Sequence, residues 1–391
     1  MRVLVIGDGA REHALCWKLV ESPLVDELYC APGGDGVAVV AECVPISPSA
    51  LQTLLSYCDE NDIEFVIVDS LAAIENGLVD MLNRNGYPAF GPDMGGVKLE
   101  ISKSFAKEFC QRRDIPSPRF ACFENSDAAM RFLDEIGLPV VIQPDRAVDR
   151  AKVAICRTRA DAEAAIAARL SKPDAGAIVI EEFLDGEEIS YAVITDGNVV
   201  LPLTSTTPRW DGEATPSRPG CLSPAPAVTP EIEREIVERI FTPTVEGMKA
   251  ERRMAKGLLS ARIMLTPEGP KVLDYKVRLS DPDWQAIVLR LQGDLMPALV
   301  SSYDEMLYRF NPFRWHDEAA AVLVIKTDGT LDSEKVATAV DAAEIADSDI
   351  VVFQSYQDRE LGVTAGGKDL DDMRKRLRAA AERIEQVLQA S

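Results

Sequence analysis

Cysteine pairs in C-x-x-C spacing are missing from this sequence, and so is any apolar run long enough to cross a membrane. Its eight cysteines are widely scattered, which favours buried reduced thiols over a zinc site or a disulfide framework. Basic residues are outnumbered, with 42 Lys and Arg against 64 Asp and Glu, and the net charge is −22. This imbalance argues against nonspecific binding to nucleic acid or to anionic membranes. The first residues enter a strand without a signal-peptide layout, so we expect a cytoplasmic protein.

The composition that is present is typical of a multidomain globular protein. The 391 residues, 47% of them apolar, suffice for two to four domains with sizeable cores. Strand-like runs at 3–6, 27–32 and 64–70 are each followed by helical material, which predicts a parallel sheet with helices on both faces. Residues 99–114 are expected to form one polar helix. Residues 204–230, rich in Pro, Ser, Thr and Gly, are expected to form a loop.

Residues 140–155, VVIQPDRAVDRAKVAI, have the pattern of two short strands that flank a loop, as in a nucleotide-binding hairpin. Loops that cradle phosphate use glycine so that backbone N–H groups can close around the oxygens. This loop contains no glycine and carries Arg146, Arg150 and Lys152 instead. The residues alone leave two interpretations open: a different kind of phosphate grip, or a site that has stopped binding nucleotide.

The stretch GDGAREHAL follows a strand and opens a helix, so the N–H groups near Gly7 and Gly9 can face an anion. Polar residues crowd the start of this helix, which favours a ligand; they are Arg11, Glu12 and His13. The alternative is a tight strand–helix turn with a surface or capping histidine. A nicotinamide-dependent oxidoreductase, which G-x-G alone would suggest, is disfavoured by the rest of the chain.

Two later stretches place charged residues on strands. In AIVIEEFLDGEEIS, a strand running into a hinge can present backbone groups to an adenine edge and a carboxylate to ribose, but the pattern alone favours a hairpin with solvated acids. In KVLDYKVRLSDPD, the two-residue strand period places Asp274, Lys276 and Arg278 on one face. Three charges share a buried face only when they are paired or contact a ligand, so we favour a cleft over an exposed edge strand.

Together these segments resemble the phosphoribosylamine–glycine ligase (glycinamide ribonucleotide synthetase) family, which has the ATP-grasp fold. The most specific stretches are VLVIGDGAREHAL, APGGDG, LEISKSFAKEF, EEFLDGEE, LSPAPAVTPE and RLSDPDWQAIVLRL. The family makes glycinamide ribonucleotide from phosphoribosylamine, glycine and ATP in purine biosynthesis. The reaction passes through an acyl phosphate, with magnesium bridging the nucleotide phosphates.

The resemblance implies an α/β and α+β multidomain ATP-grasp fold. Its expected parts are an N-terminal Rossmann-like domain at 1–102, a linker helix and lid at 103–190, a central body at 191–315, and a small β-rich C-terminal domain at 316–391. It also implies three sets of site residues. They are Lys103, Glu181, Glu182, Leu184 and Glu188 for ATP; Gly7, Gly9, Arg11, Glu12 and His13 for substrate; and Arg278 and Asp281 for catalysis.

The departures from the family pattern fall on the catalytic parts. The family lid reads close to V-K-A-D-G-L-A-A-G-K-G-V. Here Gln143 replaces the lysine that grips phosphate, and the three basic residues of the loop replace glycines. A family G-P-E near the substrate has become Asp69-Ser70-Leu71.

The family metal strand, E-F-N-x-R-F-G-D-P-E, is altered as well. Asp274 stands for the first glutamate, Lys276 for the asparagine and Asp283 for the last glutamate, while Arg262 stands where a glycine is usual. A protonated lysine has no lone pair for magnesium, which demands oxygen ligands, so magnesium binding is predicted to be lost. We expect Lys276 and Arg262 to act as built-in cations that pair with Asp274, Asp281 and Asp283.

These substitutions predict a catalytically silent or severely impaired family member, a pseudoenzyme that acts as a regulator or as the partner of another protein. One alternative is an active ATP-dependent ligase, with the family substrate or an altered one. Another is a nucleotide-independent protein that binds a small phosphoribosyl compound in the N-terminal or central cleft.

Overall fold

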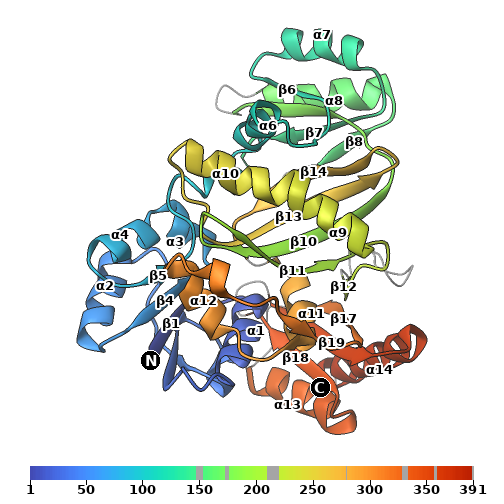
Figure 1. Cartoon of the computed structure of the whole chain (residues 1–391). Coiled ribbons are helices and arrows are strands. Elements are labelled where there is room, and N and C mark those ends of the chain that lie inside the picture. The colour runs from blue at the N-terminus through green and yellow to red at the C-terminus, as the bar shows by residue number, and fades with distance from the viewer. Residues whose placement is uncertain are drawn as a thin grey trace.

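The computed structural model describes residues 1–146, 153–171, 176–208, 220–278, 280–327, 333–355 and 359–389. Its four larger sheets, one parallel and three antiparallel, carry helices around them (Figure 1). The expected α/β and α+β multidomain fold is therefore confirmed. The domain limits stay a prediction.

A five-stranded parallel sheet forms first, in the order β3-β2-β1-β4-β5. Val3 to Gly7 of its central strand are buried, as expected of a parallel strand covered on both faces. The helical stretch after β4 forms two helices because Gly77 adopts a left-handed φ of 81° between them. The elements are β1 (Arg2–Gly7), α1 (Ala10–Leu19), β2 (Glu27–Pro32), η1 (Val37–Val39), β3 (Glu42–Cys43), α2 (Leu51–Glu60), β4 (Phe65–Val68), α3 (Leu71–Glu75), α4 (Leu78–Arg84) and β5 (Ala89–Phe90).

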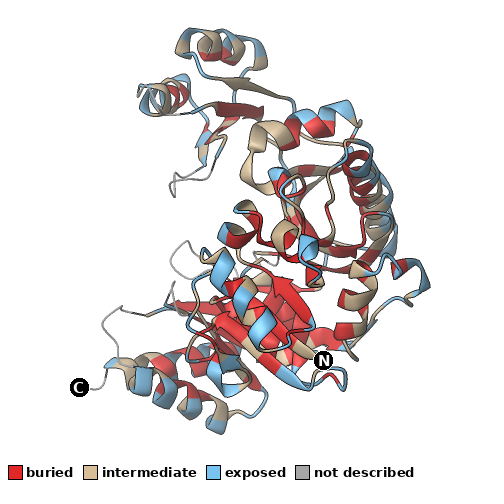
Figure 2. Cartoon of the chain, turned by 90° about the vertical axis from the view of Figure 1, so that its left-hand side faces the viewer, coloured by how far each residue is buried: buried red, intermediate tan, exposed pale blue. Residues whose placement is uncertain are grey.

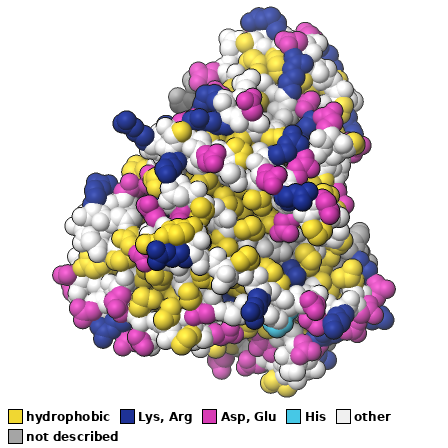
Figure 3. Space-filling view, in the orientation of Figure 1, with side chains coloured by type: hydrophobic (Ala, Val, Ile, Leu, Met, Phe, Trp, Pro, Cys, Tyr) yellow, Lys and Arg dark blue, Asp and Glu magenta, His cyan; other side chains and the backbone are white. Residues whose placement is uncertain are grey.

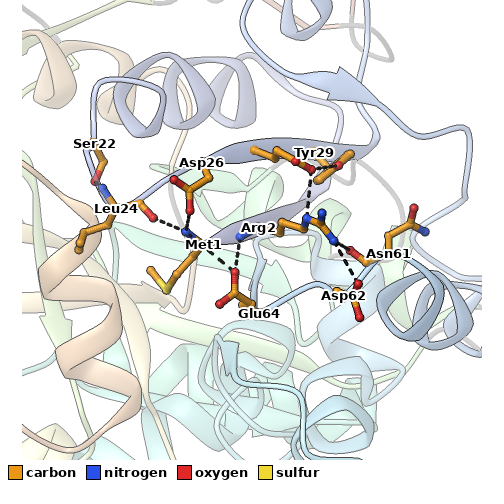
Figure 4. Close-up of polar contacts among 10 residues, drawn as sticks. Met1, Arg2, Ser22, Leu24, Asp26, Tyr29, Asn61, Asp62 and Glu64 are labelled. Atoms are coloured by element: carbon orange, nitrogen blue, oxygen red, sulfur yellow. Dashed lines mark hydrogen bonds and ion pairs between the residues drawn. The ribbon is translucent and has the colours of Figure 1, made fainter.

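Exposed polar contacts surround the start of β1 (Figure 4). The Met1 amino group donates to the Leu24 carbonyl at 2.7 Å and pairs with Asp26 at 2.5 Å. Arg2 pairs with Glu27 and Asp62, both at 3.2 Å. Exposed ion pairs of this kind each contribute little free energy. The buried apolar faces of β1 therefore hold the strand in place.

The antiparallel lid sheet, ordered β6-β9-β7-β8, lies at the top of Figure 1 beneath α7 and α8. The predicted strand–loop–strand hairpin is confirmed in β7 and β8, which pair antiparallel. The predicted polar helix at 99–114 is instead two helices, because extended Ser102 interrupts it and caps the second. The elements are α5 (Lys98–Ile101), α6 (Lys103–Arg112), β6 (Phe120–Phe123), α7 (Ser126–Ile136), β7 (Val140–Pro144), β8 (Ala154–Cys156), α8 (Arg159–Leu170) and β9 (Ile178–Glu182).

The central sheet is antiparallel, in the order β11-β10-β13-β14. One buried apolar cluster continues from the parallel sheet into this sheet, so the two share a core. A bulge shifts the β13–β14 register next to Arg262, which lies opposite Asp274. The elements are β10 (Glu187–Thr195), β11 (Val200–Thr206), α9 (Pro230–Ile236), the π-helical segment η2 (Val237–Phe241), α10 (Thr242–Ala250), β13 (Gly257–Thr266) and β14 (Gly269–Lys276).

The last sheet, ordered β12-β17-β19-β18, combines a strand from the predicted loop with three C-terminal strands. The prediction that 204–230 is entirely loop is wrong, because β12 pairs with β17 through the buried residues of GCLS; residues 209–219 lie outside the described part. The elements are β12 (Gly220–Ser223), α11 (Asp283–Arg290), β15 (Leu291–Gln292), α12 (Met296–Tyr303), η3 (Leu307–Arg309), β16 (Arg314–Trp315), β17 (Ala319–Lys326), α13 (Ser333–Ala346), β18 (Ile350–Gln354), β19 (Glu360–Gly367) and α14 (Leu370–Gln389).

Figure 2 shows the buried residues as a dense block in the lower part of the molecule, where the sheets meet. Six of the eight cysteines are buried, as expected, and Cys43 and Cys122 are partly exposed. Acidic and basic side chains are interspersed over the face shown in Figure 3. Across the described ranges, no helix combines the length and the apolar character that a membrane crossing requires.

Candidate active-site cleft

The turn between β1 and α1 packs around the buried side chain of Glu12. The Gly9 N–H donates to Glu12 Oε2 at 2.8 Å. A Cβ atom added at Gly7 would lie 2.3 Å from Glu12 Oε1, so a larger residue would displace that carboxylate. The turn therefore requires glycine in order to accommodate its own glutamate, whether or not a ligand binds there.

Arg11 joins this turn to the residues that precede α11. Its guanidinium lies 2.6 Å from Asp69, 3.0 Å from Glu12 and 3.5 Å from Asp281. The predicted substrate turn and the predicted catalytic motif are thus brought together. Arg278, in the same motif, donates through Nε to Glu100 at 3.0 Å.

Burial shifts the pKa values of three groups around this turn. It raises the pKa of Glu12 to about 7, although Arg11 acts in the opposite direction. Burial likewise raises the pKa of Asp281, again against the influence of Arg11. Burial lowers the pKa of His13 to about 4.

His13 is packed against the C-terminal sheet. Its side chain is buried, Nδ1 accepts a hydrogen bond from the Gln354 N–H at 3.1 Å, and its ring meets Phe353 edge-on with centroids 5.4 Å apart. The interpretation of His13 as a surface histidine is therefore wrong. Local sequence patterns do not predict this contact, because His13 and Gln354 are 341 positions apart.

An ion-pair network joins residues of β10, β13, β14 and α6. Arg262 Nε donates to both carboxylate oxygens of Asp274, at 3.0 and 3.1 Å. Its Nη2 donates to Asp274 Oδ2 at 2.6 Å. The same guanidinium pairs with Glu188 at 3.1 Å, and Lys103 lies 3.5 Å from Asp274. Burial alone would raise the pKa of Asp274, but Arg262 and Lys103 hold it well below its ordinary value.

Lys276 departs from the predicted arrangement of built-in cations. The pairing of Arg262 with Asp274 is confirmed. Lys276, however, donates to Ser280 Oγ at 3.0 Å and forms no ion pair within 4.0 Å among the described residues. β14 ends at Lys276, and Ser280, four residues further along, accepts the hydrogen bond from its ammonium group.

The two remaining aspartates of the predicted set have other partners. Asp281 forms an ion pair with Arg11 at 3.5 Å and accepts a hydrogen bond from Gln285 at 3.0 Å. Asp283 accepts a hydrogen bond from Thr206 Oγ1 at 2.7 Å. The expectation that Lys276 or Arg262 pairs with these aspartates is therefore wrong. Arg11, from the N-terminal turn, takes that role for Asp281.

The residues present do not fit a magnesium ion at this place. Magnesium requires oxygen ligands, and both oxygens of Asp274 already accept hydrogen bonds from Arg262. Lys276 supplies no lone pair. Within the described ranges, no group of three His, Cys, Asp or Glu side chains is placed to hold a metal ion.

The lid contains a buried polar network that joins α6, β7 and β9. Gln143 donates to Glu181 Oε1 at 2.8 Å, and Lys107 Nζ lies 2.5 Å from Glu181 Oε2. Sequence reasoning missed Lys107. The available signal was its position four residues after Lys103, which places both lysines on one face of α6.

Between β9 and β10, two of the residues expected to bind ATP, Glu182 and Glu188, contact other protein residues. The Glu182 N–H donates to the Arg119 carbonyl at 2.9 Å, and its carboxylate accepts from the Arg119 N–H at 3.0 Å. Leu184 is half-buried in the turn, and Glu188, expected at ribose, faces Arg262.

Of the three basic residues predicted for the lid loop, Arg146 is described and forms an ion pair with Glu75 of α3. Arg150 and Lys152 lie outside the described residues. Asp145, next to Arg146, accepts from the Ser104 N–H at 2.7 Å. The end of β7 is thereby fixed to the start of α6.

We expect Asp274→Asn to lower the free energy of unfolding by about 1–2 kcal/mol, since Arg262 loses its charged acceptor and part of the gain is screened by solvent. The depressed pKa of Asp274 stabilises the fold at neutral pH, and that contribution is lost as pH falls below about 4. Urea unfolding between pH 3 and 7 measures both effects. Glu268→Gln, in an exposed pair with Lys271, is the control and should change stability by less than about 0.5 kcal/mol. Equal effects of the two substitutions would contradict the assignment.

A parallel N-terminal sheet followed by two antiparallel sheets, β6-β9-β7-β8 and β11-β10-β13-β14, is the arrangement of an ATP-grasp protein. The family models agree: the N domain of phosphoribosylglycinamide synthetase matches residues 1–100, and its ATP-grasp (A) domain matches residues 101–284. The chain belongs to the phosphoribosylglycinamide synthetase (phosphoribosylamine–glycine ligase) family of purine biosynthesis.

Individual relatives support this assignment. Phosphoribosylamine–glycine ligase of Caulobacter vibrioides is 36% identical over 384 residues, which cover 95% of this chain and 90% of the relative. The crystal structure of the Thermotoga maritima ligase superposes with a TM-score of 0.78 at 23% identity, covering 98% of this chain and 97% of that one. A more distant fold neighbour is N5-carboxyaminoimidazole synthase of Aspergillus clavatus, solved with ADP and 5-aminoimidazole ribonucleotide, with a TM-score of 0.70 at 12% identity and 98% coverage of both chains.

Proposed function

We propose that this chain keeps the fold of the phosphoribosylamine–glycine ligases but does not carry out their magnesium-dependent phosphoryl transfer. One observation carries the proposal: Arg262 occupies both oxygens of Asp274 and also pairs with Glu188. Asp274 and Glu188 are thereby engaged by a side-chain cation at the place where the family pattern expects a metal ligand.

The energetic argument favours the side-chain cations over a metal. Two unit charges about 4 Å apart interact by about 4 kcal/mol at an effective dielectric of about 20. A divalent ion next to Arg262 or Lys276 would meet about twice that repulsion before solvent relaxes. Phosphoryl transfer relies on positioning and on neutralising the charge of the transferred group, so loss of the metal removes a central part of catalysis.

An active ligase is the second candidate, and the similarity to curated relatives favours it. The Caulobacter vibrioides protein, 36% identical across 95% of this chain, is named phosphoribosylamine–glycine ligase. Lys103, Arg278 and Asp281 also keep the residue types expected at their positions. On this alternative, arginine and lysine side chains would grip the phosphates in place of the metal.

Growth of a purine-requiring bacterium that lacks this ligase separates the two candidates. We expect the chain, expressed to a level verified by immunoblot, to give no growth on minimal medium. The Caulobacter vibrioides ligase expressed in the same strain is the positive control. Growth supported by this chain would overturn the proposed function.

A matching assay with the purified protein uses phosphoribosylamine, glycine and Mg-ATP. Since residues that act as a set are rarely compensated when several are replaced, we expect turnover at least about a thousandfold below that of the control ligase. Turnover within about tenfold of the control would favour the active-ligase alternative.

A further inference from the structure

Three cysteines from different elements of the N-terminal sheet region lie close together. Cys30 and Cys43 occupy paired positions on the adjacent parallel strands β2 and β3. Cys16 of α1 reaches the same place, because a hydrogen bond with its thiol is the main cause that raises the pKa of Cys30 well above the ordinary value. Cys16 and Cys30 belong to one buried apolar cluster, and Cys43 packs against it. The fold thus gathers thiols that the sequence keeps apart.

The backbone of β2 and β3 places two of these thiols within reach of a disulfide. Neighbouring strands of a sheet lie about 4.8 Å apart, and disulfides join residues whose Cα atoms are about 4.4–6.8 Å apart. Side chains alternate between the faces of a sheet along each strand, so paired residues point to the same face. Cys30 and Cys43 therefore meet the requirements of distance and direction together.

Cys43 is the member of the group that a reagent can reach. Cys16 and Cys30 are fully buried, whereas Cys43 is partly exposed. Burial raises the pKa of Cys43. The thiolate is the reactive form of cysteine, so we expect Cys43 to react slowly at neutral pH and faster at higher pH.

The loop at 33–36 is packed between Cys43 and α1. The Cys43 thiol donates to the Gly34 carbonyl at 3.4 Å, and a Cβ atom added at Gly33 would lie 2.5 Å from Cys43 Sγ. At the other end of the loop, a Cβ atom added at Gly36 would lie 2.6 Å from His13 Nδ1. A change at the sulfur of Cys43 is therefore transmitted to a loop that also contacts α1.

We propose that Cys43 and Cys30 form a disulfide when the protein meets a hydroperoxide, and that this disulfide releases the loop at 33–36 from Cys43. The inference goes beyond the proposed function and is independent of it. Both an active ligase and an inactive family member would carry the same thiols.

The reaction proceeds in two steps that balance. The Cys43 thiolate attacks one oxygen of hydrogen peroxide, the O–O bond breaks, and a sulfenic acid and water form once the leaving hydroxide takes up a proton. The Cys30 sulfur then attacks the Cys43 sulfur, the S–O bond breaks, and the second water leaves as the disulfide forms. Two thiols lose two electrons and two protons in total, and one peroxide takes them up.

Peptide mapping of the full chain after treatment with hydrogen peroxide at pH 8 tests the linkage. Cleavage after glutamate separates the two cysteines into the fragments 28–42 and 43–60. We expect these fragments to be joined after oxidation and to separate after dithiothreitol. Recovery of Cys43 as a free thiol, or as a sulfinic acid without the linkage, would overturn the inference.

Substitutions identify the cysteines that form the bond, since the fragment 43–60 also contains Cys58. We expect Cys43→Ser and Cys30→Ser each to abolish the linkage. If Cys30→Ser does not fold, Cys30→Ala serves instead. Cys122→Ser is the matched control, because Cys122 is also partly exposed but lies among charged side chains of the lid. A linkage that survives in Cys43→Ser, or that is lost in Cys122→Ser, contradicts the assignment.

Hydrogen exchange tests the second half of the inference. The Gly34 carbonyl accepts from the Ala38 N–H at 2.9 Å as well as from the Cys43 thiol. We expect the amides of residues 34–39 to exchange several-fold faster in the oxidised chain and to return to the original rate after dithiothreitol. Exchange that oxidation leaves unchanged would show that Cys43 does not hold the loop, and would overturn the proposed release.

Discussion

Replacement of Lys107 by methionine is expected to lower the stability of the lid by about 3–5 kcal/mol, because it leaves a carboxylate buried without its counter-ion. Lys107 Nζ lies 2.5 Å from Glu181 Oε2, and the two side chains are only 4% and 6% exposed. Gln143 donates to the other oxygen of Glu181, but a single neutral hydrogen bond cannot offset the burial of a full charge. Hydrogen exchange of the β7 and β9 amides measures the loss where it arises.

Two further variants test this interpretation of Lys107. The double substitution Lys107→Met with Glu181→Gln removes both charges, so we expect it to recover most of the lost stability. Lys98→Met removes an exposed lysine of the neighbouring helix and should change stability by less than about 0.5 kcal/mol. A single variant at Lys107 that is as stable as Lys98→Met would show that the buried pair contributes nothing.

The second large effect is a pH dependence of the free energy of unfolding. Glu12 and His13 contribute to it with opposite signs, so the two contributions partly cancel. The pKa of His13 is lowered from 6.5 to about 4, so the unfolded chain takes up a proton that the folded chain refuses as pH falls through this range. Stability therefore falls with decreasing pH, by up to about 3 kcal/mol. The pKa of Glu12 is raised from 4.5 to about 7, so its contribution falls as pH increases over nearly the same interval.

Single substitutions should reveal each contribution. We expect stability of Glu12→Gln to rise with pH between about 4 and 6.5, and stability of His13→Gln to fall with pH between about 4.5 and 7. The unsubstituted chain should show the weaker net dependence. Chemical unfolding at a series of pH values provides the measurement. Parallel pH profiles for the two variants would exclude this assignment of the pKa shifts.

Local patterns were sufficient to predict much of the fold. The apolar runs predicted as strands at 3–6 and 27–32 lie within β1 and β2, because buried parallel strands read as continuous apolar stretches. The break between α5 and α6 at Ser102 was not predicted. A serine inside a helical pattern can either continue the helix or cap a new one with its hydroxyl, and the pattern does not distinguish the two. β12 was missed because its partner strand lies about a hundred residues further along the chain.

The same distinction applies to the cleft. Arg262 and Asp274 lie on one hairpin only 12 residues apart, and their pairing was predicted because the family pattern places both at the metal strand. The predicted partners of Lys276 were wrong because the contact depends on how the chain bends after β14, which strand periodicity does not specify. Lys107 and Glu181 are far apart in sequence, and each resembles an ordinary surface charge until the lid folds around them.

The contact between α1 and β18 has a consequence for how the protein is made. Helix α1 emerges from the ribosome early, yet its His13 and Trp17 rings are covered by Phe353, near the other end of the chain. During synthesis, this face of the nascent helix therefore stays open to solvent, or to a chaperone, until more than three hundred further residues have been translated. These residues of α1 are thus synthesised well before the residue that covers them.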